Sequence, residues 1–214
     1  LPEFREIRKK NTDFIKLCLN PELSKEITLQ PIKRFGFDAA VIFSDILMVP
    51  HGIGQLVEFK KNFGPQLGDV NNINLDNISE KKFTDSLAPV YKLLENLKND
   101  SNLVGKDLIG FVGAPWTLMV YMINKVSPKN GLKNNFFENE KLIDKLLKIL
   151  DQFIKLHIKN QVNSGASIIQ IFDSWAGLIN GKFDKFLYNP TKSLVDYTRK
   201  LGVPVICFPR NIKD

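Results

Sequence analysis

The chain has 214 residues, of which 43% are hydrophobic and 25% are charged, as is ordinary for a water-soluble globular protein. No apolar stretch approaches the roughly 20 residues of a membrane span, and no signal-peptide pattern opens the sequence. We therefore expect no membrane partner. Cys18 and Cys207 lie far apart and form no Cys-x-x-Cys pair, so they indicate neither a disulfide framework nor a zinc site and favour a cytoplasmic location.

The net charge of +7 admits an anionic partner, such as a nucleic acid, an anionic lipid or a polyanionic small molecule. The positive residues are mostly lysines scattered over helical segments, and no cluster of Arg and Lys is interleaved with aromatics. We therefore expect no nucleic-acid partner. A basic module that binds anionic partners without catalysis stays open as an alternative function.

The first predicted element is a buried strand over Ala39–Leu47, a continuous apolar run rich in β-branched residues with one carboxylate, Asp45, near its end. Asp is rare in strands and is seldom buried without a partner. Because desolvating the charge costs several kcal/mol, a protein group or a ligand must hydrogen-bond to it. Two interpretations stay open at this point: Asp45 caps the next loop, or it binds a ligand.

Residues 48–67 do not follow the alternation of strands and helices that the rest of the chain shows. Gly52, Gly54 and the Phe63-Gly64-Pro65 break flank Val57-Glu58-Phe59, which predicts a loop with a short hairpin inserted after the Asp45 strand. Further along, helical periodicity predicts helices over 83–97, 140–163 and 190–201. Apolar runs between them predict strands over 108–114, 167–172 and 203–208.

This alternation of strands and helices predicts an α/β fold with parallel strands. Polar residues at the carboxyl ends of the strands favour a TIM (β/α)8 barrel, here a partial barrel of about four to five βα units in a single domain over residues 1–214. A Rossmann-type sheet is the rival architecture. The sequence disfavours it because no Gly-x-Gly-x-x-Gly follows any predicted strand.

The residues that could carry chemistry follow the predicted strands. They are Asp45 after the first, Tyr121 beyond the second, and Ser174 after the third. Tyr121 could equally pack in the core or at its rim, and Ser174 could simply cap a helix. His51 and His157 are the only histidines and neither has a partner at ligand spacing, so we predict no metal site; His157, on an apolar helical stripe, is expected to pack in the core.

Three segments carry a resemblance to a known family. Residues 30–47, with the sequence QPIKRFGFDAAVIFSDIL, residues 110–122 and residues 171–177, with the sequence IFDSWAG, resemble the signatures of the uroporphyrinogen decarboxylase family. The opening LPEFR resembles the stretch that follows the family's arginine-bearing motif. The resemblance covers nearly the whole chain, with the motifs in the family's order.

The resemblance implies a (β/α)8 barrel carboxy-lyase that works as a cytoplasmic homodimer in porphyrin (haem) biosynthesis. It implies cofactor-independent removal of the four acetate carboxyls of uroporphyrinogen III, which gives coproporphyrinogen III. By the same resemblance, Asp45 is catalytic: it binds the pyrrole N–H groups and stabilises the protonated pyrrole intermediate. The other substrate-binding residues that the resemblance implies are Tyr121, Ser174, Phe43, Phe111 and Phe172, the three phenylalanines lining an apolar floor under the macrocycle.

The chain also departs from the family pattern. The family's Arg-Gln-Ala-Gly-Arg motif would precede Leu1, and the strands with a substrate-binding histidine would follow Asp214. We therefore expect barrel strands two to five only, a piece that is unstable and inactive when made alone, and the proton donor stays unassigned. A related barrel methyltransferase stays open as an alternative, although it would need zinc held by His and Cys.

Overall fold

A parallel four-stranded sheet forms the centre of the computed structural model, which describes residues 1–129 and 131–212. Its strand order is β1-β4-β5-β6, and every neighbouring pair is parallel. The four strands are β1 (Ala39–Val41), β4 (Asp107–Gly113), β5 (Ile168–Asp173) and β6 (Val205–Pro209). Because consecutive sheet strands lie side by side, the order is that of consecutive βα units in a barrel.

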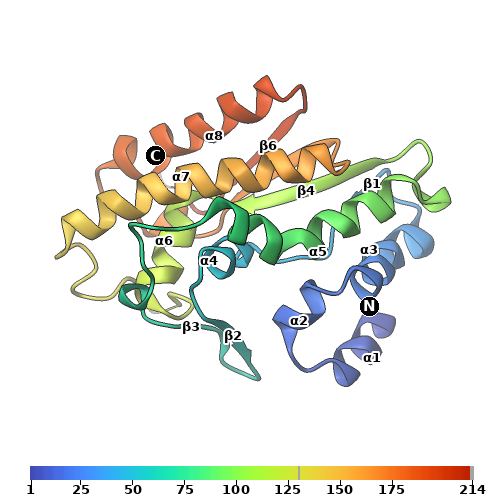
Figure 1. The fold of residues 1–214 in the computed structure, drawn as a ribbon, viewed down its shortest axis with the longest axis horizontal. Helices are drawn as coiled ribbons and strands as arrows, with labels where there is room; N and C mark the ends of the chain where they lie inside the picture. Colours follow the sequence, from blue (N-terminus) through green and yellow to red (C-terminus); the bar gives the residue numbers. More distant parts are fainter. Residues whose placement is uncertain (130, 213–214) are drawn as a thin grey trace.

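Long helices connect the strands and cover one face of the sheet (Figure 1). They are α5 (Glu80–Lys98), α7 (Glu140–Asn163) and α8 (Asn189–Lys200), and the shorter α6 (Pro115–Asn124) follows β4 directly. Helix α7 begins after an N-cap residue, Asn139, whose side chain accepts a hydrogen bond from the Leu142 N–H at 3.0 Å. Leucines, isoleucines and a phenylalanine then repeat along its buried face.

The remaining elements lie before β1 or within the connections. Helices α1 (Pro2–Lys10), α2 (Phe14–Cys18) and α3 (Pro21–Phe35) precede β1. Helix α4 (Met48–Gly52) and the antiparallel strands β2 (Val57–Lys60) and β3 (Gly64–Leu67) follow β1, and the hairpin projects away from the main sheet (Figure 1). Single turns are η1 (Val70–Asn72), η2 (Ser101–Leu103), η3 (Ala176–Leu178) and the π-turn η4 (Asp184–Tyr188).

The two faces of the central sheet differ. Side chains on the helix-covered face are buried in the main core, among them Ala40, Leu108, Val112, Ile169 and Ile171. On the opposite face Val41, Ile206 and Phe208 expose between 41% and 51% of their surface. In a closed barrel this second face would be the filled interior.

The α/β architecture and the partial barrel predicted from the sequence are confirmed. The helices predicted over 83–97, 140–163 and 190–201 correspond to α5, α7 and α8, and the strands predicted after the first correspond to β4, β5 and β6 within two residues at each end. None of the helices in the described ranges is long and apolar enough to cross a membrane.

The prediction for the first strand was wrong. We expected a strand over Ala39–Leu47, but β1 ends at Val41. Asp45 therefore lies in the loop that follows the strand, just before α4, and not within the strand itself.

Hydrogen bonds explain why the strand is short. Ile42 still donates its N–H to the Ile109 carbonyl at 3.1 Å, but the next N–H, of Phe43, donates to Thr28 Oγ1 in α3 at 2.9 Å. This bond takes the chain out of the sheet. The following residues are apolar because the loop itself packs on the core, and hydrophobic periodicity does not distinguish a buried loop from a strand.

Candidate active site

Asp45 lies at the carboxyl end of β1, where its side chain turns back on the chain. Its Oδ1 accepts a hydrogen bond from the Leu47 N–H at 2.8 Å, and its carbonyl accepts one from the Met48 N–H at 3.2 Å. The carboxylate therefore does shape the start of α4, as the capping interpretation expected. Among the described residues no Lys, Arg or His forms an ion pair with it, so Oδ2 is left for another donor.

Burial raises the pKa of Asp45 from 3.8 to about 6, and the Leu47 hydrogen bond opposes the shift. The carboxylate is thus desolvated without a compensating cation. A half-buried carboxylate with a raised pKa at the carboxyl end of a barrel strand is a strong candidate for a functional group.

Tyr121 comes to the same region from α6. Burial raises the pKa of its phenol, and hydrogen bonds with Trp175 and Ser127 oppose this shift. The negative charge of Asp45 raises the pKa further. Its ring meets the indole of Trp175 edge-on, with centroids 6.0 Å apart. The structure thus brings Asp45 and Tyr121 within electrostatic range of one another.

Ser174 lies in the turn after β5, between two anchored residues. On one side Asp173 accepts a hydrogen bond from the Thr117 hydroxyl at 2.6 Å. On the other side Trp175 donates its N–H to the Thr117 hydroxyl oxygen at 3.0 Å and accepts a bond from the Trp116 indole at 2.8 Å. The Ser174 side chain is itself half-buried.

Two of the three phenylalanines that are predicted to form an apolar floor meet in the structure. Phe111 and Phe172 meet edge-on at 5.5 Å on the open face of the sheet, and Phe208 extends the row with its ring 6.4 Å from Phe172. Phe43 packs elsewhere, against Phe4 at 5.5 Å and Phe14 at 5.8 Å. Phe43 thus belongs to an aromatic cluster with Phe4 and Phe14, and its place in the apolar floor stays a prediction.

The two histidines differ in their surroundings. His157 is buried, its Nδ1 lies 3.0 Å from the Tyr91 hydroxyl, and burial lowers its pKa to about 3, so it is a neutral core residue. His51 is half-buried in α4, and burial lowers its pKa while the Asp13 charge opposes the shift. No group of three or more His, Cys, Asp or Glu side chains within 1–129 and 131–212 is arranged to hold a metal ion.

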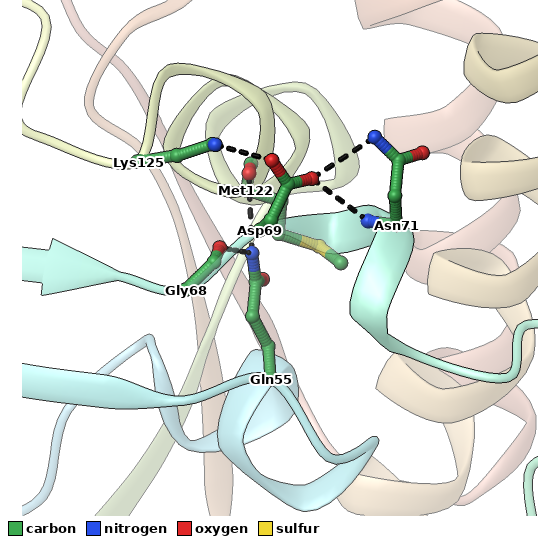
Figure 2. A network of polar contacts seen from close by, with 6 residues as sticks. All are labelled: Gln55, Gly68, Asp69, Asn71, Met122 and Lys125. Atoms are coloured by element: carbon green, nitrogen blue, oxygen red, sulfur yellow. Dashed lines mark hydrogen bonds and ion pairs between the residues drawn. The ribbon is translucent and has the colours of Figure 1, made fainter.

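The hairpin segment is fastened to the end of α6, as Figure 2 shows. The Gln55 amide donates to the carbonyls of Gly68 at 2.8 Å and Met122 at 3.1 Å. Lys125, at the end of α6, pairs with Asp69, whose pKa is lowered mainly by that hydrogen bond. Helix α6, which carries Tyr121, is therefore held at both ends.

The sequence did not predict Asp173 and Thr117 as site residues. Asp173 is 4% exposed and Thr117 is fully buried; burial raises the pKa of Asp173 to about 6, while hydrogen bonds from the Thr117 hydroxyl and N–H oppose the shift. One signal was available, because Phe172-Asp173-Ser174 ends an apolar run with a carboxylate just as Ile42-Phe43-Ser44-Asp45 does. The partner Thr117 could not be found this way, since it lies 56 residues earlier.

The fold and the site together define a class: a (β/α)-barrel protein with a carboxylate, a phenol, a hydroxyl and aromatic rings gathered at the carboxyl ends of its strands. This end of a barrel is where such proteins bind and convert small molecules. The model of the family described as "Uroporphyrinogen decarboxylase (URO-D)" matches residues 1–213. The chain belongs to the uroporphyrinogen decarboxylase family.

Individual relatives agree with this membership. The chain is 38% identical to the uroporphyrinogen decarboxylase of Rickettsia bellii (strain RML369-C), over 98% of this chain and 63% of the relative. It is equally similar, over the same shares, to that of Chelativorans sp. (strain BNC1). The chain thus spans 63% of the length of these curated relatives.

A solved structure supports the fold. A methyltransferase from Methanosarcina mazei superposes with a TM-score of 0.65, covering 88% of this chain and 56% of the other at 14% identity. At that identity the likeness concerns the fold alone.

Proposed function

We propose that the protein decarboxylates the four acetate side chains of uroporphyrinogen III to give coproporphyrinogen III in porphyrin biosynthesis. In this proposal it is a carboxy-lyase that needs no cofactor and works as a cytoplasmic homodimer. Membership of the family supports the reaction. The dimer, the location and the independence from cofactors follow from the resemblance of the motifs.

The observation that carries the proposal is the state of Asp45. Its carboxylate is desolvated, has a pKa near 6 and keeps one oxygen free of protein donors in the described chain. A desolvated acceptor of this kind suits a ligand that presents several N–H donors, as the centre of a porphyrinogen does. It would be a costly feature if its only purpose were to shape the turn before α4.

The chemistry requires a positive charge to be stabilised. When a pyrrole carbon is protonated, the ring becomes a cation, and it accepts the electron pair released when the carbon–carboxyl bond breaks and CO2 leaves. A second proton then converts the resulting methylene into a methyl group as the ring returns its first proton. A fixed carboxylate beside the ring nitrogens stabilises the cation, most strongly where water is excluded.

The neighbouring residues have roles that fit this chemistry. Tyr121 presents a phenol beside Asp45, and Ser174 presents a hydroxyl from the end of β5. Phe111 and Phe172 offer edge-on rings against which the apolar part of a macrocycle can pack. These residues bind and orient the substrate, while Asp45 provides the electrostatic stabilisation.

The test is coproporphyrinogen formation from uroporphyrinogen III by the complete natural protein that contains this sequence. Asp45→Asn keeps the side-chain volume and the Leu47 hydrogen-bond acceptor but removes the charge. We expect kcat/KM to fall by a factor on the order of 10² to 10³.

Asp76→Asn is the matched control, because Asp76 is 85% exposed and pairs with Lys145 on the surface. Its activity should equal that of the wild type. Near-normal product formation by Asp45→Asn would rule out the assigned role. An inactive wild type, or activity that depends on bound zinc, would contradict the proposed reaction and revive the methyltransferase alternative.

A further inference from the structure

Tyr121 and Ser174 come from different elements, so something must fix the distance between them. We propose that Thr117 and Asp173 are positioning residues that hold Tyr121 and Ser174 in register for the substrate. The inference rests on the proposed function. It concerns two buried residues that touch neither substrate nor reacting atoms.

The first support is the hydrogen-bond geometry. Thr117 Oγ1 donates to Asp173 Oδ1 at 2.6 Å and accepts from the Trp175 N–H at 3.0 Å. One hydroxyl therefore joins the residue before Ser174 and the residue after it to helix α6. Thr117 is fully buried and Asp173 is 4% exposed, so water competes little for these bonds.

The second support is the start of α6. The N-cap residue, Ala114, has no side chain that can accept from the helix N–H groups. Asp173, at the end of β5, provides a carboxylate instead. It accepts hydrogen bonds from both the hydroxyl and the N–H of Thr117. The Trp116 indole adds a bond to the Trp175 carbonyl at 2.8 Å. The helix start and the turn after β5 are thus one unit.

The same turn is also held from the side of β6. The Arg210 N–H donates to the Asp173 carbonyl at 3.0 Å, and the Gly177 N–H donates to the Arg210 carbonyl at 3.0 Å. Ser174 therefore sits in a turn restrained from both flanks. The Ser174 side chain is half-buried, so its hydroxyl is partly accessible to a ligand.

The link to Tyr121 is helical. Tyr121 lies four residues after Thr117, about one turn along the same face of α6. Its ring also contacts Trp175, the residue whose N–H Thr117 holds. A shift of α6 relative to the β5 turn would therefore move Tyr121 and Ser174 apart, and misplacement by about 1 Å can lower a rate by a factor on the order of 10².

The experiment is a double-mutant cycle in the complete natural protein, with kcat and KM for uroporphyrinogen III measured well below the unfolding temperature. Thr117→Val removes both hydrogen bonds at constant volume, and Tyr121→Phe removes the phenol. We expect Thr117→Val to lower kcat/KM by about tenfold to a hundredfold. The kcat/KM of the double variant should equal that of the less active single variant. The losses are not additive because Thr117 acts by positioning Tyr121 relative to Ser174.

Two comparison variants isolate the role of the hydroxyl. Thr117→Ser keeps the hydroxyl and should restore activity to within a few-fold of the wild type. Thr198→Val makes the same substitution at another fully buried threonine, whose hydroxyl donates to the Leu194 carbonyl at 2.8 Å in α8, and should leave kcat and KM unchanged. If Thr117→Val does not fold, Asp173→Leu in the same cycle tests the pair.

The outcomes separate the two proposals. An active wild type with additive losses in the cycle, or with normal kinetics for Thr117→Val, would overturn the positioning role alone. A loss that Thr117→Ser does not restore would overturn it as well. A wild type that forms no coproporphyrinogen would overturn both this inference and the proposed function.

Discussion

Asp45 and Asp173 both lie at the carboxyl ends of strands, but they differ in their hydrogen-bond partners. Burial raises the pKa of each carboxyl to about 6. Asp173 is bonded to a side chain, Thr117, and is enclosed by protein. Asp45 is bonded to one backbone N–H and keeps an oxygen free. Equal pKa shifts therefore do not imply equal roles, and the hydrogen-bond partners distinguish a ligand-binding carboxylate from a structural one.

The largest expected effect that separates the two carboxylates is on the pH dependence of activity. Because Asp45 must be ionised to accept pyrrole N–H groups, kcat/KM should fall about tenfold per pH unit below pH 6. Asp173 accepts the Thr117 hydroxyl in either protonation state. The acid limb of the pH–rate profile should therefore persist in Asp173→Asn and disappear in Asp45→Asn. The reverse pattern would exchange the roles that we assign.

The next effect is on stability at the Asp173 end. Thr117→Val should lower the free energy of unfolding by about 1–3 kcal/mol at pH 7, because the buried Asp173 carboxylate and the Trp175 N–H each lose their hydrogen bond with the Thr117 hydroxyl. Urea unfolding of the protein measures this loss. Thr117→Ser, which deletes one buried methyl, should cost about 1 kcal/mol. Equal losses for the two variants would show that the hydroxyl contributes no stability.

A smaller effect of opposite sign is expected at the Asp45 end. The folded pKa of about 6 exceeds the ordinary value of 3.8, so the contribution of Asp45 to stability is most favourable below pH 3.8 and is lost as the pH rises through 6. Asp45→Asn should therefore be more stable than the wild type at pH 8 by about 1–2 kcal/mol and equal to it at pH 3. Unfolding in urea at the two pH values checks this, and a destabilised variant at pH 8 would contradict it.

The smallest effect concerns a half-buried carboxylate that is paired with a lysine. Asp100 pairs with Lys25 at 2.8 Å, and this hydrogen bond is the largest of the causes that lower its pKa to about 2. Its contribution is therefore present above pH 4 and lost as the pH falls through 2. Asp100→Asn should cost about 0.5–1 kcal/mol at pH 7 and leave coproporphyrinogen formation unchanged. A gain in stability at pH 7 would contradict the sign.

The sequence alone predicts much of the fold because the long elements depend on local pattern. Helices α5 and α7 bury residues at regular helical spacing, and β4 and β5 are apolar runs of ordinary strand length. The first strand was predicted too long because its end depends on Thr28, a side chain of α3 that only the folded protein brings to Phe43.

The candidate site could be predicted only in part, because some of its contacts join segments that are far apart in the sequence. Asp45, Tyr121 and Ser174 lie in recognisable motifs at strand ends. The contacts of Phe43 with Phe4 and Phe14 were not predicted. The direction of the Phe43 side chain depends on how the loop leaves the sheet, and no local spacing encodes that.

The pairing of β1 with β4 has a consequence for how the protein is made. Val41 and Ile109 are partners in the sheet, yet the whole of α4, the hairpin and α5 is synthesised between them. During synthesis β1 therefore stays unpaired, with Val41 exposed, until β4 has been made. Closing so long a loop also slows folding. A nascent chain that ends before β4 should therefore depend strongly on chaperones.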